Sequence, residues 1–258
     1  MSTLETPPTA VTPQSRLEIP GTQPVPAAPA ARSLTISAYT KIRDRIISGE
    51  LAPGTWLRER ELSAELKVSR VPVREALFQL ETNGFTTTGP RHGAVVKQLT
   101  IQDVNEIFDI RLSIEVSAAS LAARQVVSGA CTDSLLEALA LAEALASSDD
   151  EHGKAQANVA IHDEIFKLTG NELLVSMIRP VANRMRWLFG NAVHQDSGQL
   201  CLEHRQLCEA ICEGQAELAS ALATAHIEHS RRPAISQLEG KLPARRSTEP
   251  RETRWEGN

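Results

Sequence analysis

Two short amphipathic segments separated by four residues constrain the fold of this chain more than any other feature. Helix is expected over about residues 59–66 and again over about 71–82, with residues 67–70 between them. Ser69 is suited to cap the second segment, and Pro72 is tolerated because it falls in the first turn. The apolar side chains that can close a small core between the two helices are Leu62, Leu66, Val68, Val73 and Leu77. This pattern predicts a helix-turn-helix.

A further helix and a hairpin flank these segments. Residues 37–48 have helical character and end at a glycine, and residues 85–88 and 94–96 are β-branched runs on either side of a Gly/Pro-rich turn. Two such runs around a turn are typical of a small hairpin. Three short helices followed by a hairpin predict a winged helix.

The arginines of this region are placed where a DNA-binding protein needs them. Arg70 and Arg74 project from the start of the second segment, where the recognition helix of a helix-turn-helix reaches base edges. The fork of arginine bonds guanine O6 and N7 together. The alternative is that these residues, with Arg58 and Arg60, form a solvated basic face. The ordered set on two successive helices, with a wing behind it, favours DNA binding.

This region resembles the GntR family of bacterial regulators. The matching residues are Ser48–Gly54, Leu57–Leu62, Val68–Leu77, Leu80, Gly84 and Arg91–Ala94. The resemblance implies DNA contacts by the residues at the corresponding positions, which are Arg60, Ser69, Arg70 and Arg74. It also implies that the tip of the wing, His92 and Gly93, approaches the minor groove. Lys67 stands where the family usually has glycine, which costs roughly 1 kcal/mol if the turn is left-handed.

From about residue 102 to 237 almost every segment has helical period, with glycines at the joints. The expected helices are 102–127, 132–148, 151–168, 172–191, 198–213 and 216–232. The fold class is therefore mainly α, a winged helix-turn-helix followed by an all-α bundle of six or seven helices. The expected organisation is a disordered, proline-rich tail over 1–32, a DNA-binding domain over 33–100, a helical effector-binding domain over 101–238 and a loose tail over 239–258.

The charge is unevenly distributed. The whole chain carries a formal charge of −5, whereas residues 33–100 hold ten Lys/Arg and seven Asp/Glu, a net charge of +3 that leaves −8 elsewhere. A basic module joined to an acidic domain suits a nucleic-acid-binding protein. Binding through a local basic patch should fall steeply with salt.

The cysteines and the apolar segments bear on the compartment. Cys131, Cys201, Cys208 and Cys212 lack the spacing of a zinc ribbon and are expected to be reduced packing residues. No secretory signal and no membrane-spanning segment is recognised. The expected compartment is the cytoplasm.

Three histidines of the helical half lie on the apolar stripes of three separate helices. His162, His204 and His226 each have apolar residues three or four positions away. A single inward histidine is usually a core residue with a satisfied hydrogen bond, but bundle cores also build metal sites from facing helices. Asn158, one turn before His162, is a fourth candidate ligand. Neutral imidazoles with an oxygen donor suit Zn²⁺ or Ni²⁺.

The helical half resembles the FCD ligand-binding domain of the FadR subfamily. The matching pieces are Phe108–Glu115, Asn158–His162, Gly170–Leu173, Glu203–Arg205, Ala210–Ile211 and His226. The resemblance implies a metal site, because metal-binding members have an Asp or Asn and three His at the positions of Asn158, His162, His204 and His226. Asn158 lacks the charge of Asp, so it would hold the ion less tightly and leave more positive charge for an anionic effector.

Two arginines are candidates for binding a carboxylate effector. Arg111 lies on a buried face of its helix, and a buried cation needs an anionic partner. That partner is either an effector carboxylate, held by a bidentate bond, or Glu115 one turn further on. Arg184 lies beside Val181 and Leu188 and is a second candidate.

The combined interpretation is a regulator, not an enzyme, that binds a short palindromic operator as a homodimer and responds to a small carboxylate effector. Two alternatives remain. A metal-dependent enzyme would need a general base near the ion, and Glu164 and Glu203 are expected to point to other helix faces. The second alternative is a regulator with a purely structural metal site that binds no effector.

Overall fold

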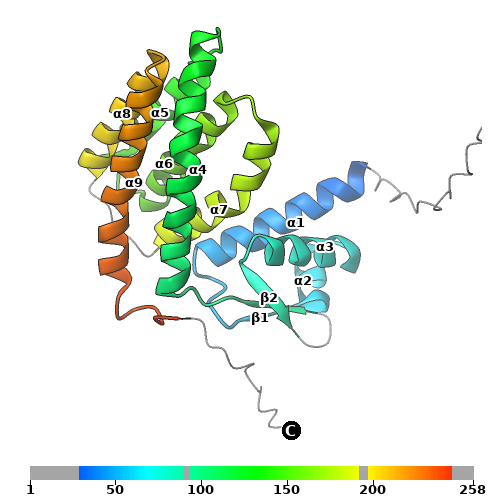
Figure 1. The fold of residues 1–258 in the computed structure, drawn as a ribbon. Helices are drawn as coiled ribbons and strands as arrows, with labels where there is room; N and C mark the ends of the chain where they lie inside the picture. Colours follow the sequence, from blue (N-terminus) through cyan, green and yellow to red (C-terminus); the bar gives the residue numbers. More distant parts are fainter. Residues whose placement is uncertain (1–28, 90–92, 192–196, 246–258) are drawn as a thin grey trace, which may run out of the picture.

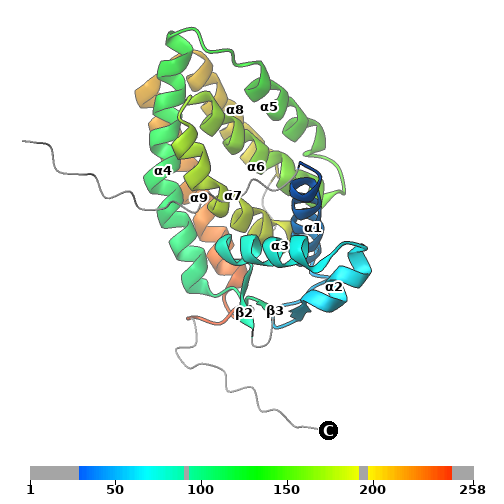
Figure 2. The same ribbon diagram turned by 90° about the vertical axis from the view of Figure 1, so that its right-hand side faces the viewer.

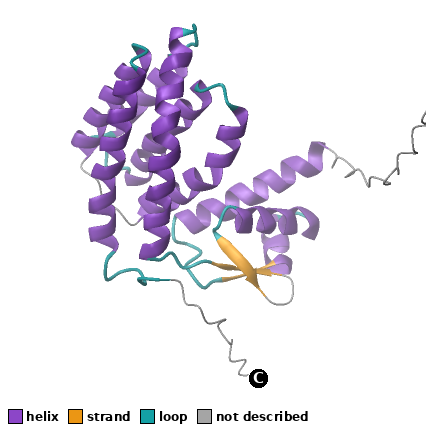
Figure 3. Ribbon diagram, viewed as in Figure 1, coloured by secondary structure: helices purple, strands orange, loops and turns teal. Residues whose placement is uncertain are grey.

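The computed structural model describes residues 29–89, 93–191 and 197–245, which form a small α/β head and a larger helical bundle (Figures 1 and 3). The bundle stands on one side of the head, and the α1 and α3 helices of the head lie nearest to it (Figure 2). The elements of the head are α1 (Pro29–Ile47), β1 (Trp56–Arg58), α2 (Glu59–Leu66), α3 (Arg70–Thr82), β2 (Thr86–Gly89) and β3 (Gly93–Val96).

The head contains a three-stranded antiparallel sheet with the order β1-β3-β2. Thr86 pairs with Val96 across the predicted hairpin, and Trp56 pairs with Val95 on the other side of β3. The winged helix-turn-helix is thereby confirmed. Strand β1 was not predicted, because three residues between a Pro-Gly turn and a helix are too few to show a period of two.

The turn between α2 and α3 is left-handed at Lys67, which has φ 54° and ψ 42°. Among the described residues, Lys67 is the only non-glycine residue with positive φ. The Ser63 hydroxyl donates to the Val68 carbonyl at 2.9 Å and closes the turn. The helix-turn-helix geometry therefore holds a lysine in the conformation that glycine adopts most easily.

Lys67→Gly is expected to stabilise the protein by about 0.5–1 kcal/mol, because relief of the left-handed strain outweighs the larger entropy of the unfolded chain. Urea unfolding of both proteins measures this difference. Lys67→Ala is the matched control, since alanine keeps the strain and should show no gain. Equal stabilities for the glycine and alanine variants would contradict the assigned strain.

The bundle consists of six helices among the described residues, in agreement with the expected all-α domain. They are α4 (Ile101–Val127), α5 (Asp133–Leu145), α6 (Glu151–Leu168), α7 (Glu172–Asn191), α8 (Ser197–Cys212) and α9 (Ala216–Leu238). No helix in the described ranges is long and apolar enough to cross a membrane.

Helix α9 continues six residues beyond the predicted end at Arg232, through Pro233. Proline removes one helical hydrogen bond and usually ends a helix. Ala234 and Leu238 are nevertheless 0% and 1% exposed. Burial of these two side chains in the shared core offsets the lost hydrogen bond.

The first and last described segments also differ from expectation. Helix α1 begins at Pro29, before the expected boundary at residue 33. Residues 239–245 fold back onto the start of α4, where the amide of Ile101 donates to the Pro243 carbonyl at 2.9 Å. This contact satisfies one of the amides that a helix start leaves free. Residues 1–28 and 246–258 lie outside the described part of the chain.

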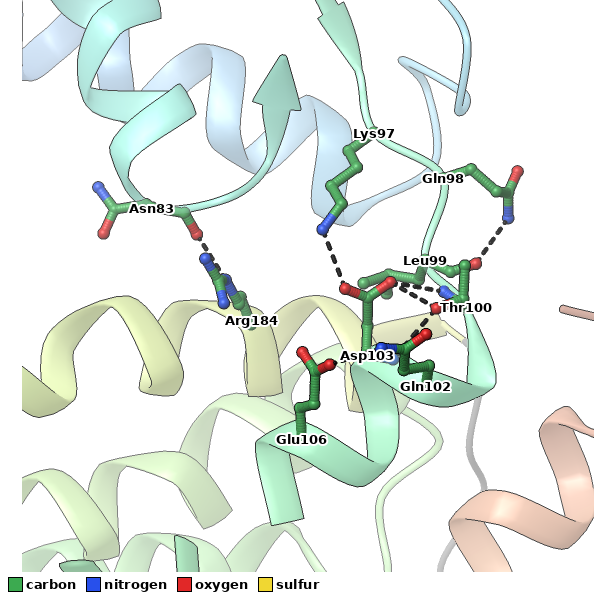
Figure 4. Close-up of polar contacts among 9 residues, drawn as sticks. All are labelled: Asn83, Lys97, Gln98, Leu99, Thr100, Gln102, Asp103, Glu106 and Arg184. Carbon is green, nitrogen blue, oxygen red and sulfur yellow. Dashed lines mark hydrogen bonds and ion pairs between the residues drawn. The ribbon is translucent and has the colours of Figure 1, made fainter. Parts of the chain in front are cut away.

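One apolar core joins the head to the bundle. Phe85 of the head packs against Trp187 of α7, with ring centroids 5.4 Å apart, and both belong to a cluster that includes Phe108 and Ile227. Polar contacts reinforce the joint, as Figure 4 shows: Lys97 pairs with Asp103 at 2.9 Å, and Arg184 Nε donates to the Asn83 carbonyl at 3.0 Å. The position of α7 and the orientation of the head are therefore mechanically linked.

Candidate DNA interface and metal centre

The predicted DNA-contacting side chains of the head lie on one exposed region around the start of α3. Arg60, Ser69, Arg70 and Arg74 are all exposed. Arg74 is held by Glu59, since its Nε and Nη2 atoms each donate to a Glu59 carboxylate oxygen at 2.9 Å. Glu59 is buried, so this ion pair fixes the direction in which the Arg74 guanidinium points. The structure thus presents a cationic group already oriented at the start of the recognition helix.

Ser69 precedes α3 with an extended backbone, as expected for an N-cap, but its side chain makes no capping hydrogen bond. The expectation that its hydroxyl caps the helix is therefore wrong in this structure. The hydroxyl is exposed instead, which leaves it available to a DNA phosphate.

Gly93 begins β3 and lies where a side chain has no room. A Cβ atom there would come within 2.7 Å of the Leu57 carbonyl oxygen and 2.8 Å of Trp56 Nε1. Glycine is therefore required at this position of the wing. His92, the other predicted residue of the wing tip, lies outside the described residues.

The three predicted histidines meet inside the bundle. His162 of α6, His204 of α8 and His226 of α9 are buried, and one potential ligand atom from each lies within 4.8 Å of the others. The Nε2 atoms of His204 and His162 are 3.3 Å apart. A cluster of nitrogen donors from three helices, all turned toward one point, is an arrangement that binds divalent metals.

Carboxylates lie behind two of the three rings. Glu115 Oε2 lies 2.9 Å from Nδ1 of His162, and Glu203 Oε2 lies 3.0 Å from Nδ1 of His226. A carboxylate on one ring nitrogen fixes the tautomer and leaves the other nitrogen free for a metal. Glu203 was expected to point away; it does leave the face of α8 that carries His204, but it reaches His226 on the neighbouring helix. Helical periodicity does not predict this role, because the contact joins two different helices.

A buried nitrogen of His204 also indicates a ligand or metal site. The Nδ1 atom of His204 is buried and has no hydrogen-bond partner among the described residues. Buried polar atoms of native proteins almost always have one. An orphaned nitrogen in a cluster of imidazoles fits a ligand or metal site.

Two of the histidines, His204 and His226, have the protonation state that metal binding requires. Burial lowers the pKa of His204 well below its usual value, and the neighbouring rings lower it further. Burial also lowers the pKa of His226 to about 4, although the hydrogen bond to Glu203 opposes the shift. Both rings are neutral at pH 7 and keep a lone pair for a metal ion.

The unfolding free energy of the metal-free protein is expected to decrease as the pH falls from 6.5 to 4. In that window the unfolded chain protonates His226 and His204 and the folded protein does not, so acid favours unfolding. The His226 shift corresponds to about 3 kcal/mol at the lower end. Urea unfolding at several pH values measures it, with His226→Gln as the comparison. A wild-type stability that stays level between pH 6.5 and 4.5 would contradict these protonation states.

Arg111 has the internal partner that sequence analysis left open. Its Nε atom donates to Glu115 Oε1 at 2.8 Å and its Nη2 atom to Glu115 Oε2 at 3.3 Å. Burial alone would raise the pKa of Glu115, but the charge of Arg111 and the contact with His162 hold it far below its usual range. The chain Arg111–Glu115–His162 therefore carries a buried, fully ionised carboxylate.

A cavity adjoins the histidine cluster and contains some of the predicted residues but not all of them. Asn158 and Arg111 line it together with the three histidines. The side chain of Asn158 makes no hydrogen bond to another described residue, so it is available to an ion or ligand. Arg184 does not line this cavity: it lies on the opposite side of α7 and contacts the turn after α3.

A winged helix joined to an all-α domain is the architecture of a DNA-binding regulator. Comparison with known families agrees with this class. Residues 34–96 match the model of the gntR family of bacterial regulatory proteins, and residues 106–229 match the FCD domain. The chain therefore belongs to the GntR family of transcriptional regulators, which are not enzymes, and carries an FCD domain behind its DNA-binding head.

Relatives and solved structures are consistent with this assignment. The Nta operon transcriptional regulator of Aminobacter aminovorans is 28% identical over 218 residues, which cover 81% of this chain and 99% of that protein. The transcriptional repressor RspR of Escherichia coli is 37% identical over 93 residues, 36% of this chain and 41% of that protein. The structure of E. coli McbR/YncC has the same fold, with a TM-score of 0.68 at 20% identity over 79% of this chain and 98% of that one.

Proposed function

We propose that this protein is a transcriptional repressor whose binding to DNA is controlled by a small organic acid, held at a divalent-metal site in the helical domain. The observation that carries the proposal is the buried cluster of His162, His204 and His226, with Glu115 and Glu203 behind two of the rings. Zn²⁺ and Ni²⁺ are the ions that this donor set suits. Asn158 would add an oxygen ligand.

The charges around the cavity support an anionic effector. Arg111 is neutralised by Glu115, and the histidines with lowered pKa are uncharged at pH 7. A dication in the cluster would therefore be the uncompensated charge of the inner cavity, at which a carboxylate is stabilised. Arg111 lines the same cavity, where two of its nitrogens are occupied by Glu115.

Helix α7 supports a route from the cavity to the head. Met185 and Phe189 line the cavity, whereas Arg184 and Trp187 on the same stretch of helix contact the turn after α3 and the Phe85 ring. An effector that shifts α7 would therefore change the orientation of the head. Coupling of this kind requires that the effector bind one orientation better than the other.

The regulator is proposed to act as a homodimer on a palindromic operator in the cytoplasm. Paired helix-turn-helix heads contact two half-sites at a fixed spacing, so a small rotation between heads changes the affinity for DNA. Arg60, Ser69, Arg70, Arg74 and the wing residues His92 and Gly93 are the proposed DNA contacts.

Thermal unfolding tests the sensor part of this proposal. Protein loaded with Zn²⁺ should melt at a higher temperature than protein stripped with a chelator, and short organic acids should raise the melting temperature further only in the loaded protein. Stabilisation by zinc without any response to acids would favour a structural metal site and contradict the sensor. Acid stabilisation that survives the chelator would contradict a role of the metal.

A further inference from the structure

The cavity extends from the histidine cluster toward the DNA-binding head. Helix α4 enters from the head, so Arg111 lies one turn nearer to it than Glu115. Helix α9 ends beside the start of α4, where Ile101 bonds Pro243, so Ser230 lies one turn nearer the head than His226. On α4 and α9, the cavity-lining residues other than His226 are Arg111 and Ser230, and both lie on the head side of the histidine cluster. A ligand at the cluster must therefore extend toward the head.

Helix α6 brings a lysine to the far end of this cavity. Lys154 lies two turns before His162 and one turn before Asn158, and all three line the cavity. The Lys154 side chain is only 16% exposed, and its Nζ atom lies 2.7 Å from Oε1 of Glu151. The side chain of Glu151 is 54% exposed, and ion pairs with an exposed partner contribute little. Glu151 also lines the cavity, so a ligand carboxylate there would share the Lys154 ammonium group with it through a charge-assisted hydrogen bond.

A serine faces the same end of the cavity. Ser230 is 6% exposed, lines the cavity and makes no side-chain hydrogen bond to any other described residue. A hydroxyl that lines the cavity can donate a hydrogen bond to a ligand oxygen. Lys154 of α6 and Ser230 of α9 reach the same cavity from different helices, and they are the candidates for a second polar subsite.

The lining of the cavity combines apolar and polar side chains. Met185, Phe189 and Leu200 are apolar, Asn158 and Arg111 are polar, and the cavity volume is about 40 Å³. This is about three times the roughly 10–15 Å³ that one water needs, so the space suits a chain of a few carbon atoms and not a long one. A short ligand that carries both carboxylates and an apolar chain matches this lining.

We propose that Lys154 and Ser230 bind a second carboxylate of the effector, which makes the effector a short dicarboxylate. The inference rests on the proposed function for the first carboxylate, at the histidine cluster. Lys154 supplies the charge that pairs with the distal carboxylate, and Ser230 donates a hydrogen bond to it.

Calorimetric titration of zinc-loaded protein with succinate and butyrate tests this assignment, because the two acids share a four-carbon chain and differ in one carboxylate. Wild type should bind succinate at least about tenfold more tightly than butyrate. Lys154→Met should weaken succinate binding by about tenfold to a hundredfold and change butyrate binding by less than about threefold. Ser230→Ala should weaken succinate binding by a smaller factor, about threefold to tenfold.

Lys167→Met is the matched control, since Lys167 pairs with Glu164 at the same spacing on α6 but its side chain is 61% exposed. It should leave both affinities unchanged, and metal analysis should find equal zinc in all variants. Unaltered succinate binding by Lys154→Met would overturn the assignment while leaving the proposed function intact. Zinc-loaded wild type that binds neither acid would overturn both.

Discussion

Replacement of Arg70 or of Arg74 by alanine is expected to weaken operator binding by about tenfold to a hundredfold in each case. Both side chains are exposed at the start of α3, where a recognition helix meets the edges of the bases. Arg74 is already oriented by its bidentate bond to the buried Glu59. Loss of the Arg74 guanidinium would therefore remove a group whose orientation exists before DNA arrives, and loss of the Arg70 guanidinium would remove an exposed cation at the start of the same helix.

Fluorescence anisotropy with a DNA fragment selected by the wild type from a random pool measures this effect. Arg124→Ala is the control, because Arg124 is exposed on the last turn of α4, at the end of that helix away from the head (Figure 1). An arginine that contacts only phosphate should also reduce the slope of affinity against salt by about one. Unchanged affinity of both the Arg70 and the Arg74 variants would contradict this interface.

His204→Ala is expected to abolish tight zinc binding, with a loss of affinity of at least about a hundredfold. Removal of a carboxylate behind a ligand already costs about tenfold to a hundredfold, and loss of the ligand itself costs more. His204 is 1% exposed, and its Nδ1 atom has no partner among the described residues. The substitution removes an imidazole whose buried nitrogen without a partner is not explained by packing alone.

Competition with a chelator of known affinity measures zinc binding, and circular dichroism shows whether the variant is folded. His152→Ala is the matched control, because His152 is exposed at the start of α6 and its ring contacts Gln156. His162→Ala is a second variant should His204→Ala fail to fold. A folded variant that keeps wild-type zinc affinity would contradict the proposed centre.

The fold of the head was predictable from local sequence patterns. The helix-turn-helix depends on residues within about one turn of each other, so periodicity and turn signals between Glu59 and Thr82 were sufficient. Strand β1 was missed because its pairing with β3 joins residues that are 35 or more positions apart in the sequence. The hydroxyl of Ser69 shows a further limit, since a residue type suited to a cap need not make the capping bond.

The three histidines of the cluster were predictable from the sequence, but not all of the residues that contact them were. Helical period shows that His162, His204 and His226 face inward, and three inward histidines in one bundle are close enough to meet. The bond from Arg111 to Glu115 follows from their spacing of four, whereas the contact between Glu203 and His226 depends on how α8 packs against α9. A contact between two helices does not change the hydrophobic periodicity of either helix, so periodicity does not predict it.

Arg184 illustrates a different limit. Its position next to apolar residues indicated a buried face, and the residue is indeed half-buried. Helix α7 however has two covered sides, one on the cavity and one on the head, and periodicity does not distinguish them. Arg184 lies on the head side, where it bonds Asn83 and belongs to the joint between the domains.

Release of DNA by an organic acid, with and without metal, is the most direct test of the central claim. Zinc-loaded wild type bound to its selected DNA should dissociate when succinate is added, and the same protein stripped of metal should not respond. His204→Ala should behave as the stripped protein does. Equal release from loaded and stripped protein, or no release from either, would contradict the account of a metal-assisted sensor that controls the DNA-binding head.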